Sequence, residues 1–119
     1  MTVRAIWRLR DMKKCVVEIR SLLAGKSFDD MLQQPVTRAA FERFLEILSE
    51  ASRHVPEQWK ASHGPTIPWR KVADLGNHIR HAYHRLDAEI LWSIYEHDLG
   101  GLEIAIDRML AAYEPGGPS

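Results

Sequence analysis

Apolar side chains recur along this chain at steps of three and four residues, the spacing that gathers them on one face of an α-helix. The stretch from about residue 36 to 55 shows this most fully, with the apolar face Phe41, Phe44, Leu45, Leu48, Ala51 and Val55. No stretch of the sequence alternates apolar and polar residues as a half-buried strand would. The sequence therefore predicts an all-α fold, a compact up-and-down bundle of four to five helices with short connections.

Capping residues and helix breakers in the first half of the chain indicate where helices begin and end. Gly25 is expected to close a first helix over about residues 3–24. Ser27 is expected to cap a short second helix that reaches about residue 34, where Pro35 ends it. After the helix at 36–55, a short extra helix is expected over about residues 57–61, followed by a loop over 62–65.

The second half of the chain carries similar signals. A helix is expected to begin at Pro68, a residue suited to the first helical position. Asp87 is expected to cap the last helical region. Within that region Gly100-Gly101 predicts a kink, or a stop with Asp98 capping a restart.

Length and composition set the class of protein. The chain has 119 residues, of which 45% are apolar, enough for one core. We expect one domain over residues 1–114 and a flexible tail over 115–119, where Pro and Gly accumulate. Cys15 is alone, so no internal disulfide framework can form. No apolar run is long enough to span a membrane and the N-terminus lacks an apolar signal core, so we expect a cytoplasmic protein without a membrane partner.

Charge is balanced over the whole chain but not along it. Lysine plus arginine number 16 and aspartate plus glutamate also number 16, so the total gives no argument for a nucleic-acid partner. Residues 68–85, however, hold four basic side chains against Asp74 alone. A local basic surface would give this pattern, and so would ordinary solvated helix faces.

The stretch from Asn77 to Tyr83 concentrates groups suited to phosphate chemistry. Histidine titrates near neutral pH, so His81 can move protons. Arg80 and Arg85 can offer forked donors to a phosphate. Asn77 lies four residues before His81, on the same side of a helix, and Tyr83 has a ring that can stack on an unpaired base. The alternative interpretation is a helix end with solvent-facing histidines.

The same histidines have another interpretation, as ligands of a metal ion. His78, His81 and His84 are spaced three apart, so two of them could share a metal, but each step of three turns about 300° and the third drifts off the face. The sequence has no Glu-x-x-His pair, Cys pair or Gly-rich phosphate loop. We therefore expect no metal and no other cofactor.

An ordered set of motifs runs through most of the chain. In order, these are Gly25-Lys26-Ser27-Phe28, Leu45 to Ala51, Ile67-Pro68-Trp69-Arg70, Asn77 to Tyr83, Asp87 to Trp92, and Asp98-Leu99. Together they resemble the HepT-like proteins of the HEPN superfamily, over about residues 9–110. The order of the motifs is far more specific than a lone His-x-Tyr.

The resemblance implies both a structure and an activity. It implies a helical bundle that forms a homodimer, with the motifs of both copies at a shared cleft. It implies a metal-independent endoribonuclease that is the toxin of a toxin–antitoxin pair, in which His81 would act on the attacking 2′-hydroxyl or the leaving oxygen of RNA. The implied partner is a minimal nucleotidyltransferase antitoxin that can attach AMP to the motif tyrosine, here Tyr83. Asn77 matches the polar residue that commonly follows the motif arginine.

The chain departs from the family at that arginine. The family places it four to six residues before the His-x-Tyr, but positions 74–76 hold no arginine, and alignment on Asn77 puts Gly76 in its place. A preorganised charge on a transition state is worth about 100- to 1000-fold in rate. Arg80, or a protonated His78, would have to supply the charge. Gly76 is compatible with a close backbone approach, such as by a helix of the other subunit, and equally with a drifted position.

Two functional hypotheses follow. In the first, the chain is an endoribonuclease in which His81 transfers protons, and Asn77 and Tyr83 position the RNA. The phosphates are then bound by Arg80, Arg85 and His78. In the second, the missing arginine has left a weak or inactive HEPN binding module, which serves as partner of the nucleotidyltransferase and as its AMPylation target at Tyr83.

Overall fold

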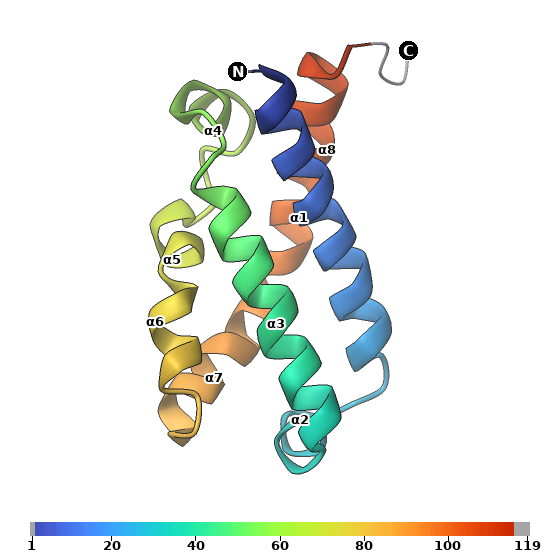
Figure 1. The fold of residues 1–119 in the computed structure, drawn as a ribbon, viewed down its shortest axis with the longest axis vertical. Helices are drawn as coiled ribbons and strands as arrows, with labels where there is room; N and C mark the ends of the chain where they lie inside the picture. The colour runs from blue at the N-terminus through green and yellow to red at the C-terminus, as the bar shows by residue number, and fades with distance from the viewer. Residues whose placement is uncertain (1, 116–119) are drawn as a thin grey trace.

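The computed structural model describes residues 2–115, which form the predicted all-α bundle (Figure 1). The long α1 descends, α3 returns beside it, the α5–α6 segment descends again, and α7 leads through η1 into the ascending α8. The short α2 and α4 lie at the two ends of α3. The predicted tail falls mostly on residues 116–119, which lie outside the described part. The elements are α1 (Thr2–Leu23), α2 (Phe28–Gln33), α3 (Pro35–Ser52), α4 (Glu57–His63), α5 (Trp69–Ala73), α6 (Leu75–Arg80), α7 (Arg85–Ser93), the π-helix η1 (Ile94–Asp98) and α8 (Leu99–Tyr113).

The core lies between α1, α3 and α8 and is built from the predicted apolar faces. Phe41 of α3 is fully buried and meets Trp92 and Tyr95 edge-to-face, with ring centroids 6.2 and 6.4 Å apart. The same helix buries Leu45, Leu48 and Ala51, as its spacing predicts. Aromatic edge-to-face pairs add to the free energy gained from burying area alone. Aromatic side chains of α3, α7 and η1 therefore meet at one continuous core.

The predicted boundaries in the first half are largely confirmed. Gly25 has φ 74°, the left-handed conformation that suits a glycine after a helix. Ser27 caps α2 through a capping box with Asp30, each side chain bonding the other's backbone N–H at 3.0 Å. These hydrogen bonds, the one from the Ser27 backbone foremost, hold the pKa of Asp30 below its usual range. The loop expected over residues 62–65 begins later, because α4 continues to His63.

Two expected features of the last helical region are wrong. Asp87 does not cap it: α7 begins at Arg85 with His84 as N-cap, and the Asp87 carboxylate bonds His78 instead. The interruption does not fall at the glycine pair either, because residues 94–98 form a π-helix and both glycines lie inside α8. The alternative expectation, a restart after Asp98, is confirmed in position, because α8 begins at Leu99 with Asp98 as its N-cap residue. The Asp98 side chain makes no cap bond, and its carboxylate accepts from Lys71 Nζ at 3.3 Å.

The helix expected from Pro68 onward is split at Asp74 into α5 and α6. A continuous helix would need the Ala73 carbonyl to accept an N–H four residues on. Side chains of α3 and its C-cap take that carbonyl instead: Ser49 Oγ at 3.1 Å, and Arg53 through Nε at 3.1 Å and Nη2 at 2.7 Å. The backbone N–H of Asn77 then bonds the Asp74 carbonyl in a tighter turn. Tertiary donors therefore break a helix whose local pattern is continuous.

A network of ion pairs joins α1 to α8. Lys13 Nζ lies 2.8 Å from Glu103 Oε2 and 2.9 Å from Asp107 Oδ1, and Arg20 also pairs with Glu103. The hydrogen bond from Lys13 is the main reason that the pKa of Glu103 is lowered, and the bond to Glu103 is the main reason that the pKa of Lys13 is raised. Elsewhere on α1, burial raises the pKa of the Cys15 thiol to about 11. Among residues 2–115, no helix is long and apolar enough to cross a membrane.

Candidate active site

The stretch from Asn77 to Tyr83, here called the motif segment, forms the end of α6 and most of the four-residue turn that leads to α7. It lies away from the end of the bundle where the chain termini lie (Figure 1). α6 ends at Arg80, and His81 is its C-cap, with its N–H bonding the carbonyls of His78 and Ile79. The turn continues with Ala82 N–H to the Ile79 carbonyl at 3.2 Å and His84 N–H to the His81 carbonyl at 2.9 Å. The helix therefore unwinds through short-range bonds across the His-x-Tyr.

Three of the four side chains of the turn are exposed to solvent. Ala82 is buried, whereas His81 and Tyr83 are exposed, Tyr83 by 74%. The rings of His81 and Tyr83 lie with centroids 6.4 Å apart, and Tyr83 is 4.2 Å from the ring of His84. The imidazole and the phenol proposed for chemistry are thus neighbours at the surface and open to a large substrate.

Arg38 of α3 holds this turn in place. Its guanidinium donates to the carbonyl of Ala82, the residue between the motif histidine and tyrosine. Glu42, one turn further along α3, accepts from Arg38 Nε at 3.2 Å and orients it. Because Ala82 lies past the end of α6, its carbonyl has no helical partner, and Arg38 supplies one. A side chain more than forty residues away in the sequence therefore fixes the backbone of the candidate site.

Arg80 is folded back along α6. It donates to the Asn77 side-chain oxygen, and Asn77 in turn donates to Asp74 Oδ1. A Cβ built at Gly76 would meet only Arg80 Nη1, at 3.8 Å. No backbone approaches Gly76 closely within the described chain, and the approach of another subunit stays a prediction. The guanidinium of Arg80 thus occupies the space beside the position where the family has its arginine.

The other two predicted phosphate contacts already have partners. His78 Nδ1 lies 2.8 Å from Asp87 Oδ1, a contact that ties α6 to α7. Arg85 lies over the ring of Phe28, 5.0 Å from its centroid, and 3.8 Å from a carboxylate oxygen of Asp29. Their roles in RNA binding stay predictions, but both side chains are directed to contacts inside the chain. Residues 2–115 contain no cluster of three or more side chains that could hold a metal ion, so the three spaced histidines do not form one.

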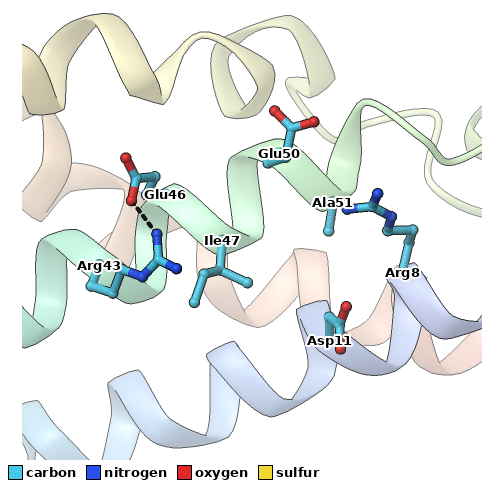
Figure 2. Close-up of a pocket in the computed structure, with 7 residues that line it drawn as sticks. All are labelled: Arg8, Asp11, Arg43, Glu46, Ile47, Glu50 and Ala51. Carbon is cyan, nitrogen blue, oxygen red and sulfur yellow. Dashed lines mark hydrogen bonds and ion pairs between the residues drawn. The ribbon is translucent and has the colours of Figure 1, made fainter.

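A hollow elsewhere on the bundle is a weaker candidate. It lies between α1 and α3 and has a volume of about 360 Å³ (Figure 2). Arg8 and Asp11 rise from α1 toward Ala51, and Arg43 pairs with Glu46 on α3 at 2.5 Å. Cations and carboxylates are interleaved here, so the hollow does not concentrate charge of one sign. None of its lining residues belongs to the motif segment.

Sequence reasoning missed three residues of the site. Arg38 carries no local signal, because an arginine in the first turns of an amphipathic helix is ordinary. Asp87 was interpreted as a cap, although its distance of nine residues from His78 fits two helices joined by a tight turn. In the sequence, Asp74 stands out only as an acid in a basic segment. In the structure, its carboxylate accepts a hydrogen bond from the Asn77 side-chain amide. Only Asp87 and Asp74 could have been suspected from spacing.

Comparison with protein families matches residues 12–109 to the family described as "Ribonuclease HepT-like". The matched region runs from the middle of α1 nearly to the end of α8 and contains the whole candidate site.

Curated relatives agree with this family. A protein of Thermococcus cleftensis named as a probable ribonuclease HepT is 32% identical over 101 residues, which is 85% of this chain and 91% of the relative. A protein of Methanocaldococcus jannaschii named as a candidate RNase is 31% identical over 91 residues, 76% of this chain and 83% of the relative. One of Caldanaerobacter subterraneus subsp. tengcongensis, also named as a candidate RNase, is 30% identical over 86 residues, 72% of this chain and 76% of the relative. No solved structure matches the chain.

Proposed function

Because this chain belongs to the HepT-like ribonuclease family, we propose that it is a metal-independent endoribonuclease and the toxin of a toxin–antitoxin pair. The observation that carries the proposal is the turn at residues 81–84. There His81 and Tyr83 are exposed side by side, and the guanidinium of Arg80 precedes them. A proton-transfer group, a stacking ring and a cation on one exposed turn suit cleavage of single-stranded RNA.

The reaction needs one proton removed and one delivered. The 2′-oxygen of the ribose forms a bond to phosphorus and gives its proton to an imidazole, while the bond from phosphorus to the 5′-oxygen breaks and that oxygen receives a proton. The products are a 2′,3′-cyclic phosphate and a free 5′-hydroxyl. In the proposed homodimer, with both motif segments at one cleft, one His81 acts as base and the other as acid.

Arg80 takes the role of the missing motif arginine in this proposal. Its only side-chain partner in the described chain is the neutral amide oxygen of Asn77, so its charge is oriented without being cancelled. Asn77 therefore positions Arg80, and Tyr83 stacks on a base next to the cleaved phosphate. A cation held in place before the reaction stabilises charge that develops on the phosphate in the transition state.

The test uses purified full-length protein and single-stranded RNA in the presence of a chelator. Wild type is expected to cleave, and His81→Ala to reduce cleavage by at least about 100-fold, the range typical of a lost acid–base group. His97→Ala is the matched control, because His97 is an exposed histidine of η1 outside the motif segment. Absence of cleavage by wild type, with chelator or with added Mg²⁺, would reject the ribonuclease proposal.

The second candidate function is a binding module that is modified rather than catalytic. The exposure of Tyr83, 74%, favours it, because a nucleotidyltransferase antitoxin could reach the phenol to attach AMP. Co-expression with a nucleotidyltransferase encoded beside this gene, followed by mass spectrometry, is expected to locate AMP on Tyr83. An unmodified Tyr83 together with no stable complex would count against this partner. We place both functions in the cytoplasm.

A further inference from the structure

A second group of arginines lies next to the candidate site, in an open hollow of about 330 Å³. Arg53, the C-cap of α3, and Arg70 of α5 line it, together with Ala73 and Asp74. None of the functional roles discussed so far uses these two arginines. The hollow falls within the size range of small-ligand sites, about 300–1,000 Å³.

The hollow holds one of its cations in a fixed position. Arg53 donates to the Ala73 carbonyl through both Nε and Nη2, at 3.1 and 2.7 Å. A guanidinium has five N–H donors, so these two bonds leave others free for a ligand. Because the carbonyl is neutral, it orients Arg53 without cancelling its charge. Ordering the side chain in advance lowers the entropy lost when a phosphate binds.

The positive charge of the hollow is only partly compensated. Neither Arg53 nor Arg70 forms an ion pair with any carboxylate among residues 2–115. The one acid in the lining, Asp74, accepts a hydrogen bond from the Asn77 side-chain amide at Oδ1. Two cations against one such carboxylate give a net positive surface that suits a polyanion.

A chain of contacts joins the hollow to the candidate site. Asp74 bonds Asn77, Asn77 bonds Arg80, and Arg80 directly precedes His81. Arg70 in α5 and His81 at the end of α6 are eleven positions apart, and the two short helices follow one another along the same side of the bundle (Figure 1). At a helical rise of 1.5 Å per residue, eleven positions correspond to about 16 Å. At ~3.4 Å per stacked nucleotide this corresponds to about five nucleotides, and fewer in an extended strand. One strand of RNA can therefore cover both regions.

We propose that the Arg53–Arg70 hollow is a phosphate subsite for the single-stranded RNA that flanks the cleavage point. This rests on the proposed ribonuclease function and extends it from the reacting phosphate to the adjoining strand. The hollow binds the sugar–phosphate backbone and reads no base, because its lining offers guanidinium groups and no aromatic ring.

The test measures the affinity of His81→Ala protein for labelled single-stranded RNA as salt is varied. Arg70→Gln in this background is expected to weaken binding of a long strand about three- to tenfold and to lower the salt slope by about 0.7, the value for one lost contact to a single strand. A short RNA that covers only the motif segment is expected to bind Arg70→Gln and its parent alike. Asp74→Asn, which removes a negative charge and keeps an acceptor for Asn77, is expected to tighten binding of the long strand.

Arg108→Gln is the matched control. Arg108 is an exposed arginine of α8 that also has no ion pair among residues 2–115. Equal affinities and salt slopes for Arg70→Gln and Arg108→Gln would overturn the subsite. So would an equal loss for short and long RNA. If wild type cleaves RNA but Arg70→Gln binds RNA as its parent does, the subsite alone is rejected. If wild type neither binds nor cleaves RNA, the ribonuclease proposal itself is rejected.

Discussion

Two cations between α1 and α8 and two arginines on the α5–α6 side of the bundle are held in different ways, although Lys71 on that second side also pairs with a carboxylate, that of Asp98. Between α1 and α8, Lys13 and Arg20 bond carboxylates, chiefly that of Glu103. On the other side, Arg53 and Arg80 bond neutral oxygens, the Ala73 carbonyl and the Asn77 amide. A carboxylate both holds a cation and cancels its charge, whereas a neutral oxygen holds it and leaves the charge available. The first arrangement stabilises the fold and the second prepares a surface for an anion.

The largest effect expected from this comparison is on Arg80. Arg80→Gln should reduce RNA cleavage by about 100- to 1000-fold, because it removes a positioned charge from the reacting phosphate. Adding Gly76→Arg to this variant should restore much of the loss. Position 76 can accept a side chain once Arg80 is gone, since a Cβ there meets no other atom within 4 Å. Cleavage rates of the single and double variants provide the measurement.

Arg20→Gln is the corresponding change on the α1–α8 face and should leave cleavage unchanged, because its charge is bound to Glu103. If Arg80→Gln retained full activity, Arg80 could not be the replacement for the motif arginine. If Arg20→Gln lost as much, the distinction between the two faces would be wrong.

A smaller effect is expected at Arg38, where the cation acts through the backbone. Arg38→Met keeps most of the side chain's apolar stem but removes the donor to Ala82, and a hydrogen bond from a charged group contributes about 1.5–3 kcal/mol. We expect about a tenfold or greater loss in kcat with little change in KM, and faster amide exchange at residues 82–84. Arg38→Lys should recover part of both.

Arg43→Met is the control for Arg38, because Arg43 lies on the same helix and, among residues 2–115, pairs only with Glu46. Equal kinetics and equal amide exchange in the two methionine variants would show that the Arg38 bond does not position the turn.

The smallest effect is expected at Glu103, and it concerns stability. The pKa of Glu103 is lowered in the folded protein, mainly by Lys13, from an ordinary value of 4.5. Its contribution is therefore fully present above about pH 4.5 and is lost as the pH falls through the lower folded pKa. Glu103→Gln should lower the free energy of unfolding by about 1 kcal/mol at neutral pH, and the difference from wild type should shrink in acid.

Urea unfolding at neutral pH and in acid measures the free energy of unfolding of Glu103→Gln and wild type. Glu18→Gln is the control, since Glu18 is an exposed acid of α1. A loss at Glu103 that did not diminish in acid would have to come from packing rather than from charge.

Particular residues show how far the sequence could be interpreted. The spacing of Phe41, Leu45 and Leu48 predicts the buried face of α3, because the period of a helix relates sequence to direction. Ser27 and Gly25 predict their boundaries because capping is local chemistry. His81 and Tyr83 could be selected as candidates from their types and their resemblance to a family, and the structure exposes both.

Other features depended on residues distant in the sequence. The continuous apolar seam through Val72 and Leu75 gives no hint that the helix breaks at Asp74, since the donors that break it, Ser49 and Arg53, come from α3 and its end. The spacing of His78 and Asp87 is compatible with their contact, but an aspartate at position 87 also suits a helix N-cap, and only the packing of α6 against α7 distinguishes the two roles.

The sequence by itself determined which segments are helical, which faces are buried and which side chains are available for chemistry. Those properties follow from periodicity and from interactions within a few residues. Only the tertiary structure decided which cations are cancelled by carboxylates and which are held by neutral oxygens. It also decided that Arg38 anchors the His-x-Tyr turn. Such pairings depend on where separate helices bring their side chains together, and a linear pattern does not encode that distance.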